Sequence, residues 1–114
     1  METLKNKDIL EILRKGKSFK TKNLIVLFRK NNLGKPRFAF VISKRFSKKA
    51  VDRNKAKRII KEAIRLYGET LKNMGYDIVI IPKIGIIGKK TYDLIKDINL
   101  IKEKLENNVK ANCG

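Results

Sequence analysis

The chain is 114 residues long, which fits one domain, and 29 Lys and Arg against 11 Asp and Glu give it a formal net charge of +18 at pH 7. Its hydrophobic fraction of 42% is enough to bury one core and argues against disorder of the whole chain. There is no His and only one Cys, Cys113, which excludes zinc fingers, intrachain disulfides and His-dependent nucleophilic or acid–base catalysis.

The longest apolar run, Leu24 to Phe28, is too short to span a membrane, and no hydrophobic signal segment follows Met1. We therefore expect a cytoplasmic protein. A chain of this charge gains free energy from polyanions, because each phosphate that it neutralises releases counterions. Nucleic acid is the first partner to consider, and an anionic membrane surface is the second.

The N-terminal half of the chain predicts one helix and two strands. Apolar residues at helical spacing indicate a short helix that Asn6 caps and Gly16 stops. A β-branched and aromatic run over residues 23–30 predicts a strand, turn-forming residues occupy 31–36, and residues 37–43 alternate between apolar and polar. This pattern is typical of an antiparallel hairpin.

The C-terminal half predicts a helix, a strand and a final helix. Asp52 is a good N-cap for a long helix that reaches about Asn73 and is ended by Gly75. Residues 77–82 read as a buried strand, and Thr91 caps the last helix. The apolar stripe of that helix consists of Leu94, Ile95, Ile98, Ile101 and Leu105.

This order of elements predicts an α+β fold, with helices packed on a small mixed β-sheet. No repeat, linker or low-complexity block interrupts the sequence, so residues 1–114 are expected to form one domain. Residues 108–114 are expected to be a frayed tail.

Nearly half of the positive excess lies between Lys44 and Arg65, where ten basic residues stand against two acidic ones. At 100° per residue the predicted helix carries apolar side chains on one stripe, and Asn54, Arg58, Lys61 and Arg65 lie about 100 to 160° round from it. Lys57 lies at the border, Arg53 and Lys55 lie in the first turn, and Arg53 projects toward the buried side, so it must reach past the end of the sheet. The stripe consists of Ala56, Ile60, Ala63, Ile64, Tyr67 and Leu71. A solvated helix usually mixes Glu with Lys, whereas this face repels itself unless a polyanion docks against it. The sequence therefore predicts a nucleic-acid-binding face made of Arg53, Asn54, Lys55, Lys57, Arg58, Lys61 and Arg65.

The stretch Val-Ile-Ser-Lys-Arg at 41–45, followed by Asp-Arg-Asn-Lys-Ala-Lys-Arg-Ile-Ile-Lys at 52–61, resembles the protein subunit of bacterial ribonuclease P. In that family a strand ending in Ser-Lys-Lys or similar precedes a helix that opens with Arg-Asn-Arg, and Lys55 stands at the third place here. The N-terminal helix and the strands at 24–28 and 76–81 follow the family's order, so the resemblance covers about residues 5–105.

The resemblance implies a left-handed β-α-β crossover around the basic helix, against the usual handedness. It also implies an RNA-binding subunit of an endoribonuclease that removes the 5′ leader from precursor tRNA. In such a ribonucleoprotein the catalytic RNA and its bound Mg²⁺ hydrolyse the phosphodiester, and the protein has no catalytic or metal-ligating residue. The partners implied are the catalytic RNA and the precursor tRNA leader, with no membrane and no further protein.

The resemblance further implies that the single-stranded leader lies in a cleft between the sheet and the N-terminal helix. The matching residues are Ile9, Leu13, Leu27, Phe28, Phe38 and Phe40, with Lys44 and Arg45 at the rim. The family commonly has aromatic residues where Ile9, Leu13 and Leu27 stand here. We therefore expect leader binding to rest mainly on phosphate contacts and to depend little on base identity.

Several alternatives accompany this interpretation. A structural RNA-binding protein, such as a ribosomal protein, fits the charge equally well. The glycines of residues 84–88 could form a KH-type loop, although a strand-to-helix connection is the simpler interpretation. A helix-turn-helix DNA-binding protein would need a helix where residues 37–43 read as a strand. Asp93 and Asp97 lie one turn apart and could bind a metal ion, but carboxylates in a first helical turn more often interact with the helix dipole.

Overall fold

A sheet with the strand order β1-β4-β5-β3-β2 forms the centre of the computed structural model, which describes residues 2–113 and the side chains of residues 3–108. The strands are β1 (Glu2–Thr3), β2 (Lys17–Lys20), β3 (Leu24–Lys30), β4 (Arg37–Phe40) and β5 (Tyr76–Pro82). The helices are α1 (Asn6–Lys15), α2 (Ala50–Tyr67) and α3 (Ile95–Cys113), with 3₁₀ turns η1 (Glu69–Asn73), η2 (Ile84–Ile86) and η3 (Thr91–Leu94). The predicted α+β fold, with helices on a mixed sheet, is confirmed.

Strand β5 lies between β3 and β4, antiparallel to the first and parallel to the second. The predicted hairpin of β3 with β4 is therefore wrong, because residues 31–36 carry the chain across the width of β5. Nearly all of β5 is buried, so its backbone N–H and C=O groups need hydrogen-bond partners within the protein. A central position in the sheet provides them, because β5 then has a paired strand on each side. Strand β3 instead forms its hairpin with β2, which the sequence did not predict.

Helix α2 connects the neighbouring parallel strands β4 and β5. This is the β-α-β unit for which the resemblance implies a left-handed crossover. The helix-turn-helix alternative is wrong, because α2 follows β4 and an extended loop rather than a helix. The KH alternative fails in the same way, since residues 84–88 follow strand β5 and turn back at Gly88, whose φ is +85°.

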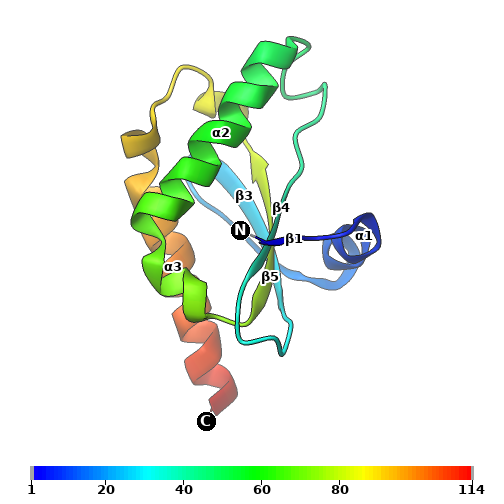
Figure 1. Cartoon of the computed structure of the whole chain (residues 1–114), viewed down its shortest axis with the longest axis vertical. Helices are drawn as coiled ribbons and strands as arrows, with labels where there is room; N and C mark the ends of the chain where they lie inside the picture. Colours follow the sequence, from blue (N-terminus) through cyan, green and yellow to red (C-terminus); the bar gives the residue numbers. More distant parts are fainter. Residues whose placement is uncertain (1, 114) are drawn as a thin grey trace.

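The helices divide unequally between the two faces of the sheet (Figure 1). Helices α2 and α3 lie side by side on one face, which we call the α2–α3 face. Helix α1 lies on the opposite face, the α1 face, where it contacts β3 and β5. One face is therefore covered by two long helices and the other by one short helix.

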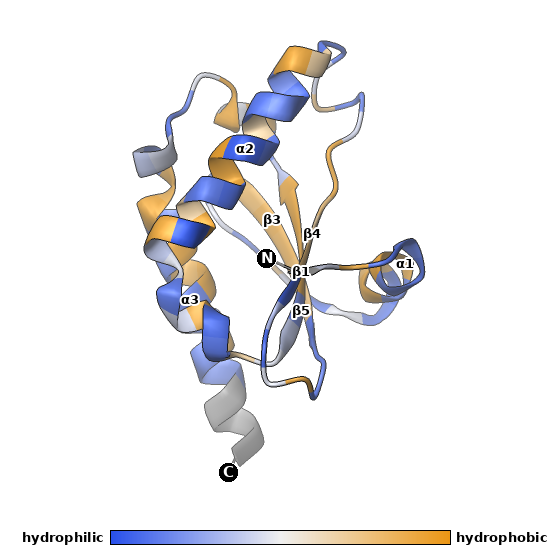
Figure 2. Cartoon of the chain, in the orientation of Figure 1, coloured by the Kyte–Doolittle hydropathy of each residue, from blue (hydrophilic) through white to orange (hydrophobic). Residues whose placement is uncertain are grey.

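The main core fills the α2–α3 face, where strand residues such as Val26 and Ile80 pack against Ile60 and Ile98. A second, smaller cluster on the α1 face consists of Leu4, Ile12, Ala39 and Val79. In Figure 2 the sheet strands are predominantly apolar, whereas α2 alternates between apolar and polar stretches along its length. This alternation is the expected pattern of a helix with one buried stripe.

All three predicted helix caps lie one to three positions inside their helices, and a lysine occupies each cap position. The predicted caps are Asn6, Asp52 and Thr91, and the residues at the cap positions are Lys5, Lys49 and Lys90. A lysine side chain has no acceptor, so it cannot cap the free N–H groups of the first turn. Asp93 accepts a hydrogen bond from the backbone N–H of Lys90 at 2.8 Å, and Asp52 accepts one from the Ser47 hydroxyl at 2.9 Å.

Helix α2 ends at Tyr67 rather than near Asn73 as predicted, and η1 follows. Gly68 marks the end, and a Cβ there would lie 2.7 Å from the Ile64 carbonyl oxygen, so a larger residue would not fit. The predicted last helix is divided into η3 and α3: Leu94 of η3 and Ile98, Ile101 and Leu105 of α3 are completely buried, as the stripe predicted, but Ile95 remains 38% exposed. The backbone of α3 is helical to Cys113, through most of the predicted tail, and Gly114 lies outside the described residues.

Candidate nucleic-acid interface

Helix α2 separates its apolar and cationic side chains onto opposite sides, as the sequence predicted. Its buried residues are Ala56, Ile59, Ile60, Ala63 and Ile64. The residues that we call the basic face are Arg53, Asn54, Lys55, Lys57, Arg58, Lys61 and Arg65. Five of these seven are exposed, and Arg53 and Lys61 are half-buried. The core contacts of the buried stripe thus fix which way the cations point.

The two half-buried cations of the basic face have specific contacts. Arg53 donates a hydrogen bond from Nη1 to the Ser47 carbonyl at 2.8 Å, so it binds the loop before α2 to the helix. Lys61 lies over the ring of Phe40, with Nζ 5.7 Å from the ring centroid. Both side chains are therefore held in place before any ligand binds.

Little negative charge offsets the basic face. Glu62 pairs with Arg65 at 3.8 Å, but their side chains are 45% and 67% exposed, so this pair contributes little stability. The loop before α2 adds Lys44 and Arg45, both exposed. Cations therefore continue from the end of β4 along α2, which suits the closely spaced phosphates of a nucleic acid.

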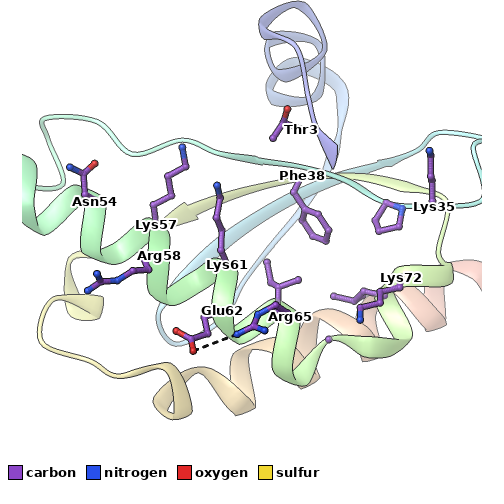
Figure 3. A pocket seen from close by; sticks show the side chains of 14 residues that line it. Thr3, Lys35, Phe38, Asn54, Lys57, Arg58, Lys61, Glu62, Arg65 and Lys72 are labelled. Carbon is purple, nitrogen blue, oxygen red and sulfur yellow. Dashed lines mark ion pairs between the residues drawn. The ribbon is translucent and has the colours of Figure 1, made fainter. Parts of the chain in front are cut away.

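A groove of about 990 Å³ runs between α2 and the β1–β4 edge of the sheet (Figure 3). Lys57 and Lys61 point from α2 toward β4, and Phe38 points from β4 toward α2. Pro36, Ile64 and Leu71 also line it. The groove thus combines apolar side chains with cations of the basic face. Local sequence patterns did not indicate it, because the groove depends on how α2 packs against the sheet and on β1, which is far from α2 along the chain.

The residues predicted for the leader cleft lie on both faces of the sheet. Phe28 and Phe38 are buried in the core of the α2–α3 face, and Phe40 packs against that core. Ile9 and Leu27 belong to the cluster on the α1 face. Side chains alternate between faces along a strand, so the neighbours Leu27 and Phe28 cannot line one cleft. The grouping of all three phenylalanines with the N-terminal helix is therefore wrong.

Around α1, four half-buried apolar residues of the sheet form what we call the α1-side strip. They are Ile25 and Leu27 of β3, Ile81 of β5 and Val41 beyond β4. Ile9 packs beside the strip, and Leu13 is 39% exposed. The sequence analysis missed Ile25, Val41 and Ile81, although the alternation of each strand with Leu27, Ala39 or Val79 places them on this face.

Charged side chains fasten α1 to the sheet at the other end of the α1 face. Asp77 of β5 is fully buried and accepts hydrogen bonds from Arg37 Nε and Nη2, both at 2.8 Å, and from Asn31 at 2.9 Å. Arg29 lies 3.4 Å from Asp77 and reaches Asp8 and Glu11 of α1 at 3.2 and 3.1 Å. We call this set the Asp77 network.

Opposing effects act on the buried carboxylate of this network. Burial pushes the pKa of Asp77 upward, but hydrogen bonds from Arg37 and Asn31 and the charge of Arg37 outweigh it, and the pKa lies below its ordinary value. Asp77 is therefore a structural anion that stays charged at neutral pH.

The two carboxylates considered as metal ligands have other partners. Asp93 accepts the Lys90 backbone hydrogen bond, and Asp97, which is 3% exposed, accepts one from Asn23 Nδ2 at 2.8 Å. Within the part of the chain that the structure describes, no three His, Cys, Asp or Glu side chains come together as metal ligands. Asp93 and Asp97 are therefore both engaged in hydrogen bonds within the protein.

Comparisons with known proteins identify the family. The ribonuclease P family profile matches residues 2–106. The ribonuclease P protein component of Pelotomaculum thermopropionicum is 34% identical over 104 residues, which cover 91% of each chain. The chain belongs to the ribonuclease P protein family. The ribonuclease P protein component of Thermotoga maritima is 36% identical over 106 residues, which cover 91% of this chain and 85% of that protein.

Solved structures of ribonuclease P proteins share the fold. The Thermotoga maritima protein superposes with a TM-score of 0.78 at 32% identity, covering 90% of this chain and 97% of that one. The Staphylococcus aureus protein has a TM-score of 0.74 at 24% identity, covering 90% and 92%. Membership makes the chain an RNA-binding, tRNA-processing subunit that associates with ribonuclease P RNA. Among the described helices, none is long and apolar enough to cross a membrane.

Proposed function

We propose that the basic face of α2, together with Lys44 and Arg45, binds the catalytic RNA of ribonuclease P in the holoenzyme that removes the 5′ leader from precursor tRNA. The observation that carries this proposal is the one-sidedness of α2. Its buried stripe directs the cations outward, and the acids of α2 are Asp52, which accepts a hydrogen bond from Ser47, and the weakly paired Glu62. Such a face is self-repulsive in isolation and gains most from a polyanion.

The single-stranded leader is proposed to lie on the α1-side strip, next to Ile9 and Leu13. Two features support this placement. The strip is apolar and half-buried because α1 covers the face incompletely, and Lys44 and Arg45 follow β4 at the end where Ile25 and Ile81 lie. Bases can therefore contact aliphatic side chains while these cations contact phosphates.

Phosphodiester hydrolysis is proposed to be the work of the RNA and of Mg²⁺ bound to it. The protein is proposed to increase the affinity for the RNA substrate and to position it. Its described residues form no cluster of three possible metal ligands, and the sequence has no His. It neutralises RNA phosphates and holds the leader next to the RNA. The protein alone is therefore expected to cleave no RNA.

Reconstitution with a bacterial ribonuclease P RNA and precursor tRNA tests the role of the basic face. We expect cleavage only when the RNA is present, and an affinity loss of about tenfold or more for Lys55→Ala/Arg58→Ala, with the salt slope reduced by about one per cation. Lys96→Ala/Lys104→Ala on α3 removes the same charge elsewhere and serves as the control. An unchanged affinity of the first variant contradicts the assignment, and tight binding without stimulated cleavage indicates a structural RNA-binding protein instead.

The leader site is tested with precursor tRNAs that carry a leader of several nucleotides or of one. The longer leader is expected to bind the holoenzyme more tightly, and Leu27→Ala and Lys44→Ala to reduce that gain. Ile87→Ala removes an exposed apolar side chain, 46% exposed, outside the strip and should leave the gain intact. If neither Leu27→Ala nor Lys44→Ala reduces the gain, the leader lies elsewhere.

A further inference from the structure

The groove between α2 and the β1–β4 edge has a floor of apolar side chains. Phe38, Ile64 and Leu71 lie there, each at most 4% exposed, and Pro36 completes it. The Phe38 ring is nearly parallel to that of Phe40, at 9° and 6.4 Å between centroids, so packing fixes its orientation. The floor is therefore formed in advance, as in small-molecule sites of this volume class.

The rim of the same groove is cationic. Lys57 and Lys61 enter it from α2, and Lys72 lies at its far end (Figure 3). The acid on the rim, Glu62, is paired with Arg65 at 3.8 Å. An apolar floor inside a cationic rim is complementary to a molecule with a flat apolar part and a negative charge beside it.

We propose that this groove binds one unstacked nucleotide of the catalytic RNA, with its base on the floor and its phosphates on Lys57 and Lys61. The proposal rests on the proposed function, because it assumes that the basic face meets that RNA. An RNA duplex keeps its bases stacked and offers only phosphates and hydroxyls, so it would leave the floor empty. A base turned out of a loop or bulge would fill it.

The position of the groove favours the catalytic RNA over the leader as the source of this nucleotide. The groove opens on the α2–α3 side, next to the basic face. The α1-side strip lies on the opposite face, with the sheet between the two. A leader held on the strip cannot also fill the groove without passing round the sheet edge.

Thr3 provides a way to reach the groove without changing its charges. It is exposed, lines the groove, and pairs with Phe38 in the β1–β4 register, so its side chain shares the face of Phe38. A photo-crosslinker on Thr3→Cys, in a Cys113→Ser chain, is expected to label one unpaired nucleotide of the RNA. Labelling of paired segments only, or of the leader, would overturn the proposal.

An abasic substitution at the labelled nucleotide then decides the role of the base. With the unmodified chain, we expect holoenzyme assembly to weaken about tenfold, the scale of one base contact. Thr3→Trp places an indole ring in the groove, so this variant should bind the intact RNA more weakly than the unmodified chain does. Its affinity should fall little further when the RNA is abasic. Thr70→Trp, an exposed site in η1, is the matched control and should behave as the unmodified chain.

The outcomes separate this proposal from the function on which it rests. No base occupies the groove if the unmodified chain binds the abasic RNA as tightly as the intact RNA. The same conclusion follows if the abasic substitution lowers the affinity of Thr3→Trp as much as that of the unmodified chain. The loss caused by Lys55→Ala/Arg58→Ala would persist in that case, and only the nucleotide site would be wrong. If that double variant also binds normally, the basic face itself is misassigned.

Discussion

The two faces of the sheet differ in how they hold their helices. On the α2–α3 face, fully buried residues such as Ile60, Ile78 and Ile98 form a continuous apolar core. On the α1 face, α1 fully buries Ile12 alone among its residues, and Leu10 remains 62% exposed. Apolar burial stabilises the first face, and the second is left open where the leader is proposed to bind.

Charge replaces part of the missing apolar burial on the α1 face. Arg29 connects Asp77 in the sheet to Asp8 and Glu11 on α1, and Arg37 approaches Asp8 at 3.8 Å. An ion-pair network occupies one end of the face, so the apolar strip at the other end can stay uncovered. The contrast teaches that a recognition surface can be kept exposed when its neighbouring helix is fastened elsewhere.

The largest stability effect is expected on the α2–α3 face. Ile60→Ala would leave a cavity in a core with little room to collapse, and we expect a loss of about 4 kcal/mol in the free energy of unfolding. Denaturant unfolding measures it. Ile84→Ala, at a side chain 66% exposed, should change stability by about 0.5 kcal/mol or less. A loss at Ile60 below that at Ile12 would reverse the comparison of the faces.

Removing the charge of Asp77 should have the next largest effect. Asp77→Asn leaves Arg37 and Arg29 beside a neutral amide at a fully buried site, and we expect a loss of about 3 kcal/mol at pH 7. The control is Glu103→Gln on the exposed side of α3. A loss no greater than that of the control would show that the network does not stabilise the fold.

The pH dependence of the Asp77→Asn effect follows from the lowered pKa. Since the pKa of Asp77 is lower in the folded chain than its ordinary value of 3.8, the folded state favours the charged form. This contribution is fully present above that ordinary value and is lost as the pH falls through the folded pKa. The stabilities of the original chain and the variant should therefore converge in acid, as unfolding curves at a series of pH values would reveal. A difference that stays constant in acid contradicts this account.

Ile12→Ala tests the apolar contribution to α1 docking. Ile12 and Ile60 are both fully buried, so the two substitutions remove the same atoms from different faces. We expect a loss of about 2 kcal/mol, at the low end for such changes, because the cluster on the α1 face is small. Hydrogen exchange should speed up in α1 more than in α2. Equal acceleration in both helices would mean that α1 does not open independently.

The sequence predicted what depends on local periodicity. The stripe around Ile60 follows from helical spacing, so the direction of the α2 cations could be derived from the order of the residues alone. The order of strands could not, because the pairing of β5 with β3 joins residues far apart in the chain. The turn-forming residues at 31–36 favour a hairpin of β3 with β4. The almost wholly buried β5 pairs with both strands instead and occupies the central position between them.

The error in the leader cleft has a different origin. The alternation of Leu27 and Phe28 can be read from the sequence, but the family resemblance implies aromatic residues near the leader and so favours the phenylalanines of this chain. The structure places Phe28 in edge contact with Phe19 and Tyr76, at 5.8 and 5.7 Å between centroids. These rings fill the core, so the strip is aliphatic.

The smallest expected effect tests whether the aliphatic strip limits leader affinity. Leu13 is 39% exposed beside the strip, so Leu13→Phe adds a ring for a base to stack on without burying new volume in the core. Stacking of one base is worth about 1 kcal/mol at the low end, so the affinity gain from a longer leader should rise about fivefold. Leu10→Phe, on the outer side of α1, is the matched control and should leave the gain unchanged. Because every base has a stacking face, the increase should be similar for leaders of different sequence. An increase with both variants would indicate a general effect on α1, and no increase with Leu13→Phe would place the leader bases away from this helix.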